Sequence, residues 1–233
     1  MSAMEKTLCE GLPQLGLELD ESKRKTLCDF GHAVIAQNQV MNLTAITEPA
    51  QVAKLHLLDS LSVLTVADLK GKKIIDVGCG AGFPGVPLKI ACPEAQLTLL
   101  DSLGKRMAWL ETVLPQLGVE ARCVTARAEE AVQTCREQYD YATSRAVARL
   151  NVLLELTAPY VKVGGAVLAM KGAAAKEELA EAKNAINRLG LKLERVVEFP
   201  IDGTAHAVIV LRKVAHTPAQ YPRRYAKIKQ APL

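Results

Sequence analysis

The sequence predicts an α/β fold in which an N-terminal helical extension precedes a seven-stranded, mostly parallel sheet whose last strand is antiparallel. Three observations lead to this fold class. Residues 5–70 have a helical pattern. From residue 72, short apolar runs alternate with helix-like segments, and this alternation builds parallel sheets with helices on both faces. The last two apolar runs, 192–199 and 206–212, are too close together for an intervening helix, so they pair antiparallel.

The N-terminal extension is predicted to contain two helices. Asp20 is a good N-cap, because its side chain can accept a hydrogen bond from the first turn of a helix that runs to about Gln37. A second helix is expected from Thr47 to about Ala67. Pro49 fits its first turn, where no backbone N–H is needed.

The remaining elements follow the alternation of the sheet. Strands before the hairpin are expected at 73–77, 96–101, 121–126, 140–145 and 166–171. Helices are expected between them at about 85–91, 103–117, 127–137, 149–160 and 174–189. By analogy of fold alone, such a sheet, closed by a hairpin with a turn around Asp202-Gly203, is typical of Rossmann-like class I methyltransferases. The predicted parts are a helical extension over 1–70, a catalytic domain over 71–213 and a C-terminal tail over 214–233.

The composition favours a cytoplasmic protein with a substantial core. Of the 233 residues 49% are hydrophobic, and the apolar runs are far shorter than the roughly 18 residues that span a membrane. The first residues lack the basic and apolar regions of a signal peptide. The six cysteines include no C-x-x-C pair, which favours reduced thiols over disulfides or a zinc site. We expect no membrane contact, no metal and a monomer.

The net charge of +4 comes from the C-terminal end of the chain. Residues 203–233 hold no acidic residue and six basic ones: Arg212, Lys213, Arg223, Arg224, Lys227 and Lys229. Such a segment is either a solvated tail or, with Tyr221 and Tyr225 interleaved, a surface for a nucleic-acid backbone. On the second interpretation Arg223 and Arg224 contact RNA.

The most informative motif is a glycine-rich turn after the first strand. Asp76 is followed by Gly78, Gly80, Gly82 and Gly85, and glycine, which lacks a Cβ, lets a ligand approach the backbone. The spacing from Gly80 to Gly85 fits the dinucleotide pattern G-x-G-x-x-G, which leaves NAD open. Asp76 favours S-adenosylmethionine, because a carboxylate repels a pyrophosphate and attracts ammonium and sulfonium groups.

Further cofactor contacts are expected where the strands end, since doubly wound sheets bind ligands at the carboxyl ends of their strands. Phe83 in the glycine loop can flank the ligand. Asp101 ends the second strand and can accept hydrogen bonds from both ribose hydroxyls, although it is also placed to cap the following helix. Residues 126–129, after the third strand, are expected to contact adenine.

Four residues are candidates for the methyl-acceptor side. Arg145 and Lys171 end the fourth and fifth strands, and the planar Arg145 guanidinium can bind phosphate or guanine. His56 and Asp59 share one helix face, either as a local polar face or as a cover for the acceptor. The fourth strand lacks an Asn-Pro-Pro-Tyr run and a Pro-Cys pair, so no base or nucleophile is indicated. A ring nitrogen with a free lone pair, such as guanine N7, needs neither.

Five segments together resemble the RsmG (GidB) family of bacterial 16S ribosomal RNA guanine-N7 methyltransferases. They are 38–46, 56–61, 76–88, 144–147 and 170–172. The closing Tyr221-Pro-Arg-Arg and Pro232-Leu also look like that family, so the resemblance runs from about residue 38 to the C-terminus. Gln39 departs from the family pattern, which has a lysine there, and removes one phosphate contact.

The resemblance implies methyl transfer from S-adenosylmethionine to N7 of a guanine in the 530 loop of 16S ribosomal RNA, either naked or in the 30S subunit. It implies cofactor contacts at Gly78, Phe83, Ala128, Glu129 and Arg145, with Asp101, Ser102 and Leu103 beside the ribose and adenine. Because N7 carries no proton, the expected mechanism is a direct in-line displacement. Arg145 and Lys171 would then position the RNA instead of acting as bases.

Three other functions stay open from the residues themselves. A small-molecule methyltransferase has no use for the basic tail. An NAD-dependent oxidoreductase uses the glycine loop for a dinucleotide. A non-catalytic RNA-binding module binds RNA but not the cofactor.

Overall fold

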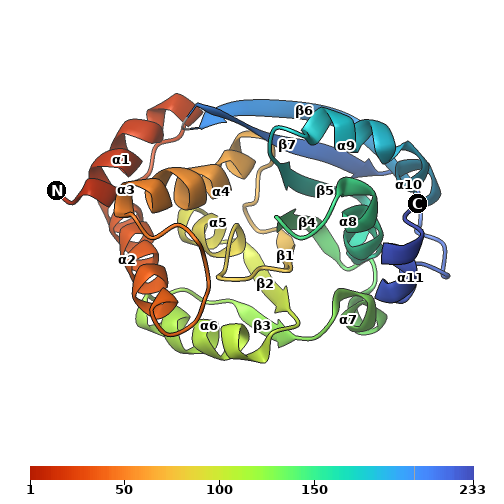
Figure 1. Ribbon diagram of the computed structural model, residues 1–233, viewed down its shortest axis with the longest axis horizontal. Coiled ribbons are helices and arrows are strands. Elements are labelled where there is room, and N and C mark those ends of the chain that lie inside the picture. The colour runs from red at the N-terminus through yellow and green to blue at the C-terminus, as the bar shows by residue number, and fades with distance from the viewer. Residues whose placement is uncertain (202) are drawn as a thin grey trace.

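The computed structural model describes residues 1–201 and 203–233. Its seven-stranded sheet has the order β3-β2-β1-β4-β5-β7-β6, with helices on both faces (Figure 1). The strands are β1 (Lys73–Val77), β2 (Gln96–Asp101), β3 (Arg122–Thr125), β4 (Tyr139–Arg145), β5 (Val161–Lys171), β6 (Leu191–Ile201) and β7 (Thr204–Lys213). The α/β fold class expected from the alternating pattern is confirmed.

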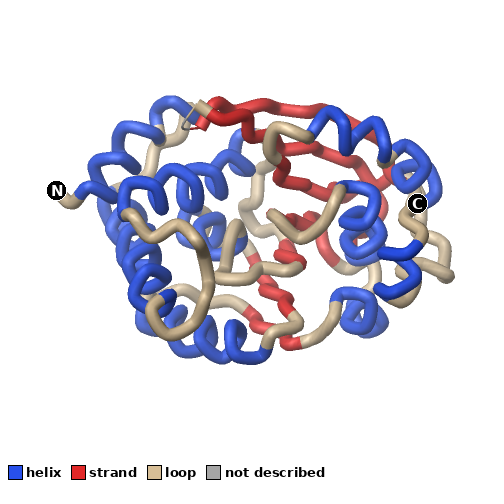
Figure 2. The backbone as a smooth tube through the Cα atoms, viewed as in Figure 1, coloured by secondary structure: helices blue, strands red, loops and turns tan. Residues whose placement is uncertain are grey.

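Strand pairing confirms the mostly parallel sheet and its antiparallel end. Strands β1 to β5 pair in parallel, whereas β7 is antiparallel to both of its neighbours, β5 and β6. The tight turn expected around Asp202-Gly203 includes Asp202, which lies outside the described residues. Figure 2 shows the strands as one twisted band between two layers of helices.

The N-terminal region is helical throughout most of its length. It contains α1 (Ala3–Gly11), η1 (Pro13–Leu15) and α2 (Glu21–Asn38), followed by a continuous run of α3 (Pro49–Val52), η2 (Ala53–Leu58), α4 (Asp59–Leu61) and η3 (Ser62–Thr65). Asp20 caps α2 as predicted, by accepting a hydrogen bond from the Lys23 backbone N–H at 2.8 Å. The η2 segment is a π-helical turn that contains His56, and such turns are frequent at functional sites.

The other helices are α5 (Gly85–Ala91), α6 (Gly104–Gln116), α7 (Ala128–Cys135), α8 (Leu150–Thr157), η4 (Ala158–Tyr160), α9 (Ala175–Glu181), α10 (Lys183–Arg188) and α11 (Tyr225–Gln230). Two predicted boundaries are wrong. The helix expected over 174–189 is split at Ala182, whose ψ of 3° leaves helical geometry. Strand β5 begins at Val161, earlier than the predicted start at residue 166. The prediction missed this part of the strand because Gly164 and Gly165 have weak strand propensity.

The helical extension and the sheet share one hydrophobic core. Successive strand residues point to opposite faces, so Ile74 packs in the layer of α1 to α6 and Ile75 in the layer of α8 and α10. Phe30 of α2 belongs to the same cluster as Leu99 of β2. The boundary expected at residue 70 therefore does not separate two cores.

No helix in the described residues is long and apolar enough to cross a bilayer. All six cysteines are free thiols. The described residues also contain no group of three or more His, Cys, Asp or Glu side chains that could hold a metal ion.

Candidate functional site

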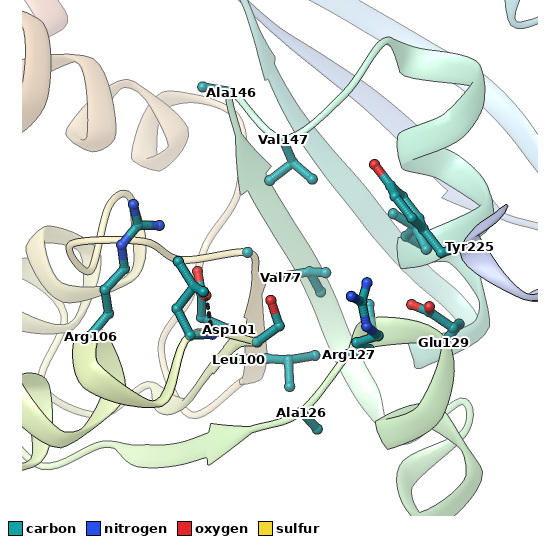
Figure 3. Close-up of a pocket in the computed structure, with 15 residues that line it drawn as sticks. Val77, Leu100, Asp101, Arg106, Ala126, Arg127, Glu129, Ala146, Val147 and Tyr225 are labelled. Carbon is teal, nitrogen blue, oxygen red and sulfur yellow. Dashed lines mark hydrogen bonds between the residues drawn. The ribbon is translucent and has the colours of Figure 1, made fainter. Parts of the chain in front are cut away.

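Two cavities open at the carboxyl edge of the sheet, where the strand order reverses between β1 and β4. The first has a volume of about 390 Å³ and lies beside the loops after β1, β2 and β3 (Figure 3). The second, of about 700 Å³, lies between the ends of β4 and β5 and the helical run that holds His56. Ala146 and Val147 line both cavities. Strand-order switch points are where open α/β sheets bind ligands, and both volumes suit small molecules.

The wall between the cavities has an unusual backbone. Ala146 has a φ of 56°, a left-handed conformation that costs a residue with a Cβ roughly 1 kcal/mol. Just before it, the Ser144 hydroxyl donates a hydrogen bond of 2.7 Å to the carbonyl of Val77 at the end of β1. This hydrogen bond joins the ends of β1 and β4 where the cavities meet, and it holds the strained turn at Ala146 in place.

Gly78 is the glycine on which the first cavity depends. Its φ is +71°, and a Cβ at this position would lie 2.5 Å from Cγ2 of Val147. The backbone N–H groups of Gly78 and Cys79 both donate to the carbonyl of Leu100, at 2.8 and 3.1 Å, and fix the turn against β2. Gly78 lines the cavity with bare backbone, as predicted.

Asp101 lines the first cavity and also fixes the loops around it. Its Oδ2 accepts a hydrogen bond from the Gly80 backbone N–H at 2.9 Å, and its Oδ1 accepts one from the Leu103 backbone N–H at 2.8 Å. Asp101 therefore lies at the cavity but does not cap α6, whose N-cap residue is Leu103 and which has no side-chain cap; the contact of Asp101 with ribose hydroxyls stays a prediction. Gly80 acts through this contact and is not among the residues that line the cavity.

The other predicted contacts of the first cavity divide into two groups. Ser102, Leu103, Ala128 and Glu129 line it, and their contacts with the cofactor stay predictions. Phe83 is not among the residues that line this cavity, and its contact with the cofactor stays a prediction.

Phe83 lies instead behind the second cavity. Its ring centroid is 4.8 Å from that of His56 and 5.3 Å from that of Phe30. The Arg145 guanidinium lies 5.2 Å from the same centroid. A large apolar ring gains more from this aromatic and cationic packing than from exposure in a loop, which explains the difference.

Asp76 is buried beneath the glycine loop. Its Oδ2 accepts a hydrogen bond from the Gly85 backbone N–H at 2.7 Å, while Oδ1 has no partner among the described residues. Burial raises the pKa of Asp76 to about 7, although the Gly85 N–H and the charge of Arg145 act in the opposite direction. The Asp76 side chain is fully buried and lines neither cavity, so its predicted contact with the cofactor stays a prediction.

The raised pKa of Asp76 predicts a pH-dependent stability difference. The folded state holds the proton more tightly than the unfolded state, so this stabilisation is present below about pH 4 and lost as the pH rises through about 7. Asp76→Asn keeps an oxygen for Gly85 and stays neutral. Urea unfolding should show the variant gaining, relative to the unmodified protein, on the order of 4 kcal/mol between pH 4 and 8. A constant difference over this range would contradict the buried-acid assignment.

Arg145 organises the second cavity. Its Nη1 donates to the Leu55 carbonyl and to Asp59 Oδ2, both at 2.8 Å, and its Nη2 donates to His56 Nδ1 at 3.0 Å. The sequence placed His56 and Asp59 on one helix face, and the structure adds the cation that joins them. Arg145 lines the second cavity and not the first.

The pKa values of the two histidines of this cavity are shifted in opposite directions. Nδ1 of His56 lies 3.0 Å from the Arg145 guanidinium, which can only donate, and 3.0 Å from the Leu55 carbonyl, which can only accept, while Nε2 lies 2.8 Å from Thr44 Oγ1. Burial and the Arg145 charge lower the pKa of His56 to about 4, so this ring is neutral at pH 7. His206 is the opposite case, because its Nδ1 lies 2.9 Å from Asp59 Oδ1 and the hydrogen bond to that carboxylate raises its pKa.

The contacts of His206 require a proton on each ring nitrogen. The Thr204 hydroxyl donates its hydrogen to the Ile201 carbonyl at 2.8 Å, so it accepts from His206 Nε2 at 3.0 Å. Asp59 accepts from the other nitrogen. Burial opposes ionisation of Asp59, but the hydrogen bonds from His206 and Arg145 outweigh it and lower its pKa.

Lys171 also lines the second cavity, and its side chain is nearly buried. Its ammonium contacts Glu178 at 2.8 Å and donates to the Ala148 carbonyl at 2.5 Å. Glu178 accepts a second hydrogen bond from the Leu150 backbone N–H at 2.7 Å. The charge of Lys171 is therefore already paired, and its place in the structure is to hold the loop after β4.

The C-terminal segment is packed against the sheet domain, which rules out a fully solvated tail. Arg223 donates to both carboxyl oxygens of Glu155, with the shortest contact at 2.6 Å. This gives Arg223 a structural partner, and its contact with RNA stays a prediction. Arg224 is exposed.

Sequence patterns missed His206, which lines the second cavity, and they assigned Tyr225 to a possible nucleic-acid surface, whereas it lines the first cavity. The signal for His206 lay in the antiparallel pairing, because β5 ends at Lys171, opposite Ala207 at the start of β7. Tyr225 had no such signal, since its position depends on the path of residues 214–224.

Comparison with known proteins shows the relationships of the chain. The family model described as rRNA small subunit methyltransferase G matches residues 23–206. Proteins named ribosomal RNA small subunit methyltransferase G from Alkaliphilus metalliredigens and Alkaliphilus oremlandii are 44% and 45% identical to this chain, each over 97% of both chains. The one from Lactobacillus johnsonii is 42% identical over 95% of this chain and 96% of its own.

Solved structures share the fold at low identity. A TehB-like SAM-dependent methyltransferase from Corynebacterium glutamicum is 20% identical with a TM-score of 0.53, covering 78% of this chain and 98% of its own. A SAM-dependent methyltransferase from Aquifex aeolicus is 16% identical with a TM-score of 0.55, covering 76% and 97%. The class I methyltransferase fold and the RsmG resemblance predicted from the sequence are both confirmed. By sequence the chain belongs to the rRNA small subunit methyltransferase G (GidB) family.

Proposed function

We propose that the protein transfers a methyl group from S-adenosylmethionine to N7 of a guanine in the 530 loop of 16S ribosomal RNA. The first cavity is assigned to the cofactor and the second to the guanine. The name of the family supports a ribosomal RNA substrate, and the nucleotide is the one that the motif resemblance implies. The partner is then the RNA or the 30S subunit in the cytoplasm, acted on by a monomer.

The residues of the first cavity fit S-adenosylmethionine. Gly78 offers bare backbone in a cradle that a Cβ would fill. Asp101 lies at the cavity as a hydrogen-bond acceptor for ribose hydroxyls. A dinucleotide pyrophosphate fits less well, because the Asp101 carboxylate would repel it. When bound, S-adenosylmethionine supplies an electrophilic methyl group.

The observation that carries the choice of N7 is that the acid–base groups lining the second cavity are already engaged. His56 uses both ring nitrogens, on Arg145 and Thr44. Asp59 accepts from Arg145 and His206, and Glu178 is paired with Lys171. An acceptor that must lose a proton needs a free base, whereas guanine N7 has no proton to lose.

The residues of the second cavity position the acceptor. Those that carry charge are four cations, Arg145, Arg149, Lys171 and His206, and two carboxylates, Asp59 and Glu178. An excess of positive charge suits a polyanionic RNA. The strained turn at Ala146 separates the cavities, and N7 has to approach the methyl group to about 3–3.5 Å past this turn.

Transfer of a labelled methyl group tests the proposal. The protein is incubated with tritiated S-adenosylmethionine and 30S subunits, or with naked 16S RNA, from cells that lack the enzyme. Label should appear at N7 of one guanine in the 530 loop. Label on another nucleotide or on free metabolites only would refute the proposed substrate, and RNA binding without any transfer would favour a non-catalytic module.

The exposed cations of the C-terminal segment are expected to contribute to RNA binding. Arg224, Lys227 and Lys229 are exposed on or beside α11. Replacing all three by alanine should lower RNA affinity at low salt and reduce the slope of log affinity against log salt concentration by about 2. Filter binding across a salt series measures both quantities.

A matched variant removes the same charge elsewhere. Lys6, Lys23 and Lys25 lie on α1 and α2 of the N-terminal region, and their replacement by alanine should leave the salt slope close to that of the unmodified protein. Equal slopes for the two triple variants would contradict a role of α11 in RNA binding.

A further inference from the structure

The C-terminal segment is anchored to the sheet domain by hydrogen bonds from buried and partly buried groups. Arg136 after α7 donates to the carbonyls of Thr217 and Tyr221, both at 2.8 Å. The fully buried Lys213 ammonium lies 3.1 Å from Glu137. These contacts set the path of the chain after β7.

The strongest anchor is the ion pair between Arg223 and Glu155. Glu155 lies in α8 with a fully buried side chain, and it accepts from the Arg223 backbone N–H at 2.8 Å as well as from the guanidinium. A buried carboxylate held by backbone and side chain of one residue fixes that residue in both position and direction. Residues 224 and 225 follow directly.

This anchor places the first residue of α11 at the first cavity. Tyr225 lines that cavity, and Ile228, one turn later, is fully buried against Val152 and Leu156 of α8. In Figure 3, Tyr225 lies on the opposite side of the cavity from Asp101 and Arg106. The C-terminal segment therefore supplies one wall of a cavity whose other walls are strand ends, the loops after them and residues of α6, α7 and α8.

The chemistry of this wall suits a planar purine. Ala128, at the start of α7, packs in the same apolar cluster as Tyr225. Arg127 and Glu129 line the cavity on the side of Tyr225 in Figure 3. Asp101 is on the far side, where a ribose would be held by its hydroxyls. The aromatic ring of Tyr225, across the cavity from this ribose site, offers a face on which a base can stack.

We propose that Tyr225 contacts the adenosine moiety of the cofactor, and that the Arg223–Glu155 ion pair is the positioning device that keeps it there. This assignment rests on the proposed function of the first cavity. The basic C-terminal segment then has two roles: its exposed cations bind RNA, and its Tyr225 contacts the cofactor. The matching family model ends at residue 206, before this segment.

Isothermal titration of the full chain with S-adenosylmethionine and with S-adenosylhomocysteine tests the assignment. Tyr225→Ala should weaken both ligands by about tenfold, because the lost contact is with the part they share. Tyr225→Phe keeps the ring and should bind within about twofold of the unmodified protein. Gln230→Ala, an exposed change at the other end of α11, is the matched control and should not alter affinity.

The anchor is tested by a double-mutant cycle. Arg223→Met should weaken cofactor binding while Tyr225 is present and add little to the loss in Tyr225→Ala, since it acts through that ring. Arg223→Lys should restore part of the affinity. Thermal unfolding of each variant shows that the titrated protein is folded.

The outcomes separate this inference from the proposed function. If the unmodified protein binds neither ligand, the cofactor assignment itself is wrong. If it binds both and Tyr225→Ala binds them equally well, Tyr225 is not a contact. A loss confined to S-adenosylmethionine would place the ring at the methyl group and overturn the adenosine assignment. Additive losses in the cycle would overturn the positioning role of Arg223.

Discussion

Arg145→Met is expected to reduce methyl transfer to ribosomal RNA at least a hundredfold and to lower the free energy of unfolding by about 3 kcal/mol. The guanidinium holds Asp59, His56 and the Leu55 carbonyl together. Without it, the nearly buried carboxylate of Asp59 keeps His206 as its one charged partner in the described part of the chain. Removing one member of a buried ion pair leaves an uncompensated charge, which costs more than the pair contributes.

Arg149→Met is the matched control, because Arg149 lines the same cavity. It pairs with Glu177 and Glu181 at 2.7 Å, but all three side chains are exposed. Its loss should change the free energy of unfolding by less than about 1 kcal/mol. Urea unfolding at pH 7 measures both variants. A similar cost for the two would mean that the Arg145 network is not a buried unit.

The second large effect is expected at the glycine loop. Gly78→Ala should cost about 3 kcal/mol of stability and lower cofactor affinity at least tenfold. A left-handed residue with a Cβ costs roughly 1–2 kcal/mol, and overpacking against a stiff side chain adds about as much again. The new Cβ would meet Val147, which lines both cavities, at 2.5 Å, so the distortion spreads to the wall between them.

Gly71→Ala separates the two causes. Gly71 has a φ of +67°, close to that of Gly78, but a Cβ there would meet nothing within 4 Å. This variant should lose only the backbone cost of about 1 kcal/mol and bind the cofactor normally. Val147→Ala, added to Gly78→Ala, should recover part of the loss. Equal destabilisation by Gly71→Ala and Gly78→Ala would show that the contact with Val147 carries no cost.

Much of the fold was predictable because its determinants are local. The alternation of apolar runs and helix-like segments gave the strands β1 to β4 nearly to the residue, and Asp20 caps α2 as its residue type suggests. The glycine loop and Asp101 were also predictable from short stretches of sequence. They lie at the ends of neighbouring predicted strands, and the carboxyl ends of neighbouring parallel strands lie at one edge of the sheet. The first half of β5 was not predicted, because Gly164 and Gly165 have weak strand propensity.

The charge state of the site was not predictable from local pattern. Asp76 was predicted to be an anion close to the cofactor, yet it is buried below α5 with a pKa near 7. Arg223 read as a free cation, and only the path of the C-terminal segment shows that Glu155 is its partner. Both depend on contacts between residues far apart in the chain, which no short motif encodes.

The network around Asp59 has a consequence for the order of folding. Asp59 is 86 residues from Arg145 and 147 residues from His206, whereas the Gly80–Asp101 contact of the first cavity spans 21 residues. Contacts between distant residues form late, because a large loop must close before any stabilisation is gained. A refolding chain should therefore complete the floor of the first cavity before the second exists, and pulsed amide exchange should protect β1 and β2 ahead of the helical run that holds His56.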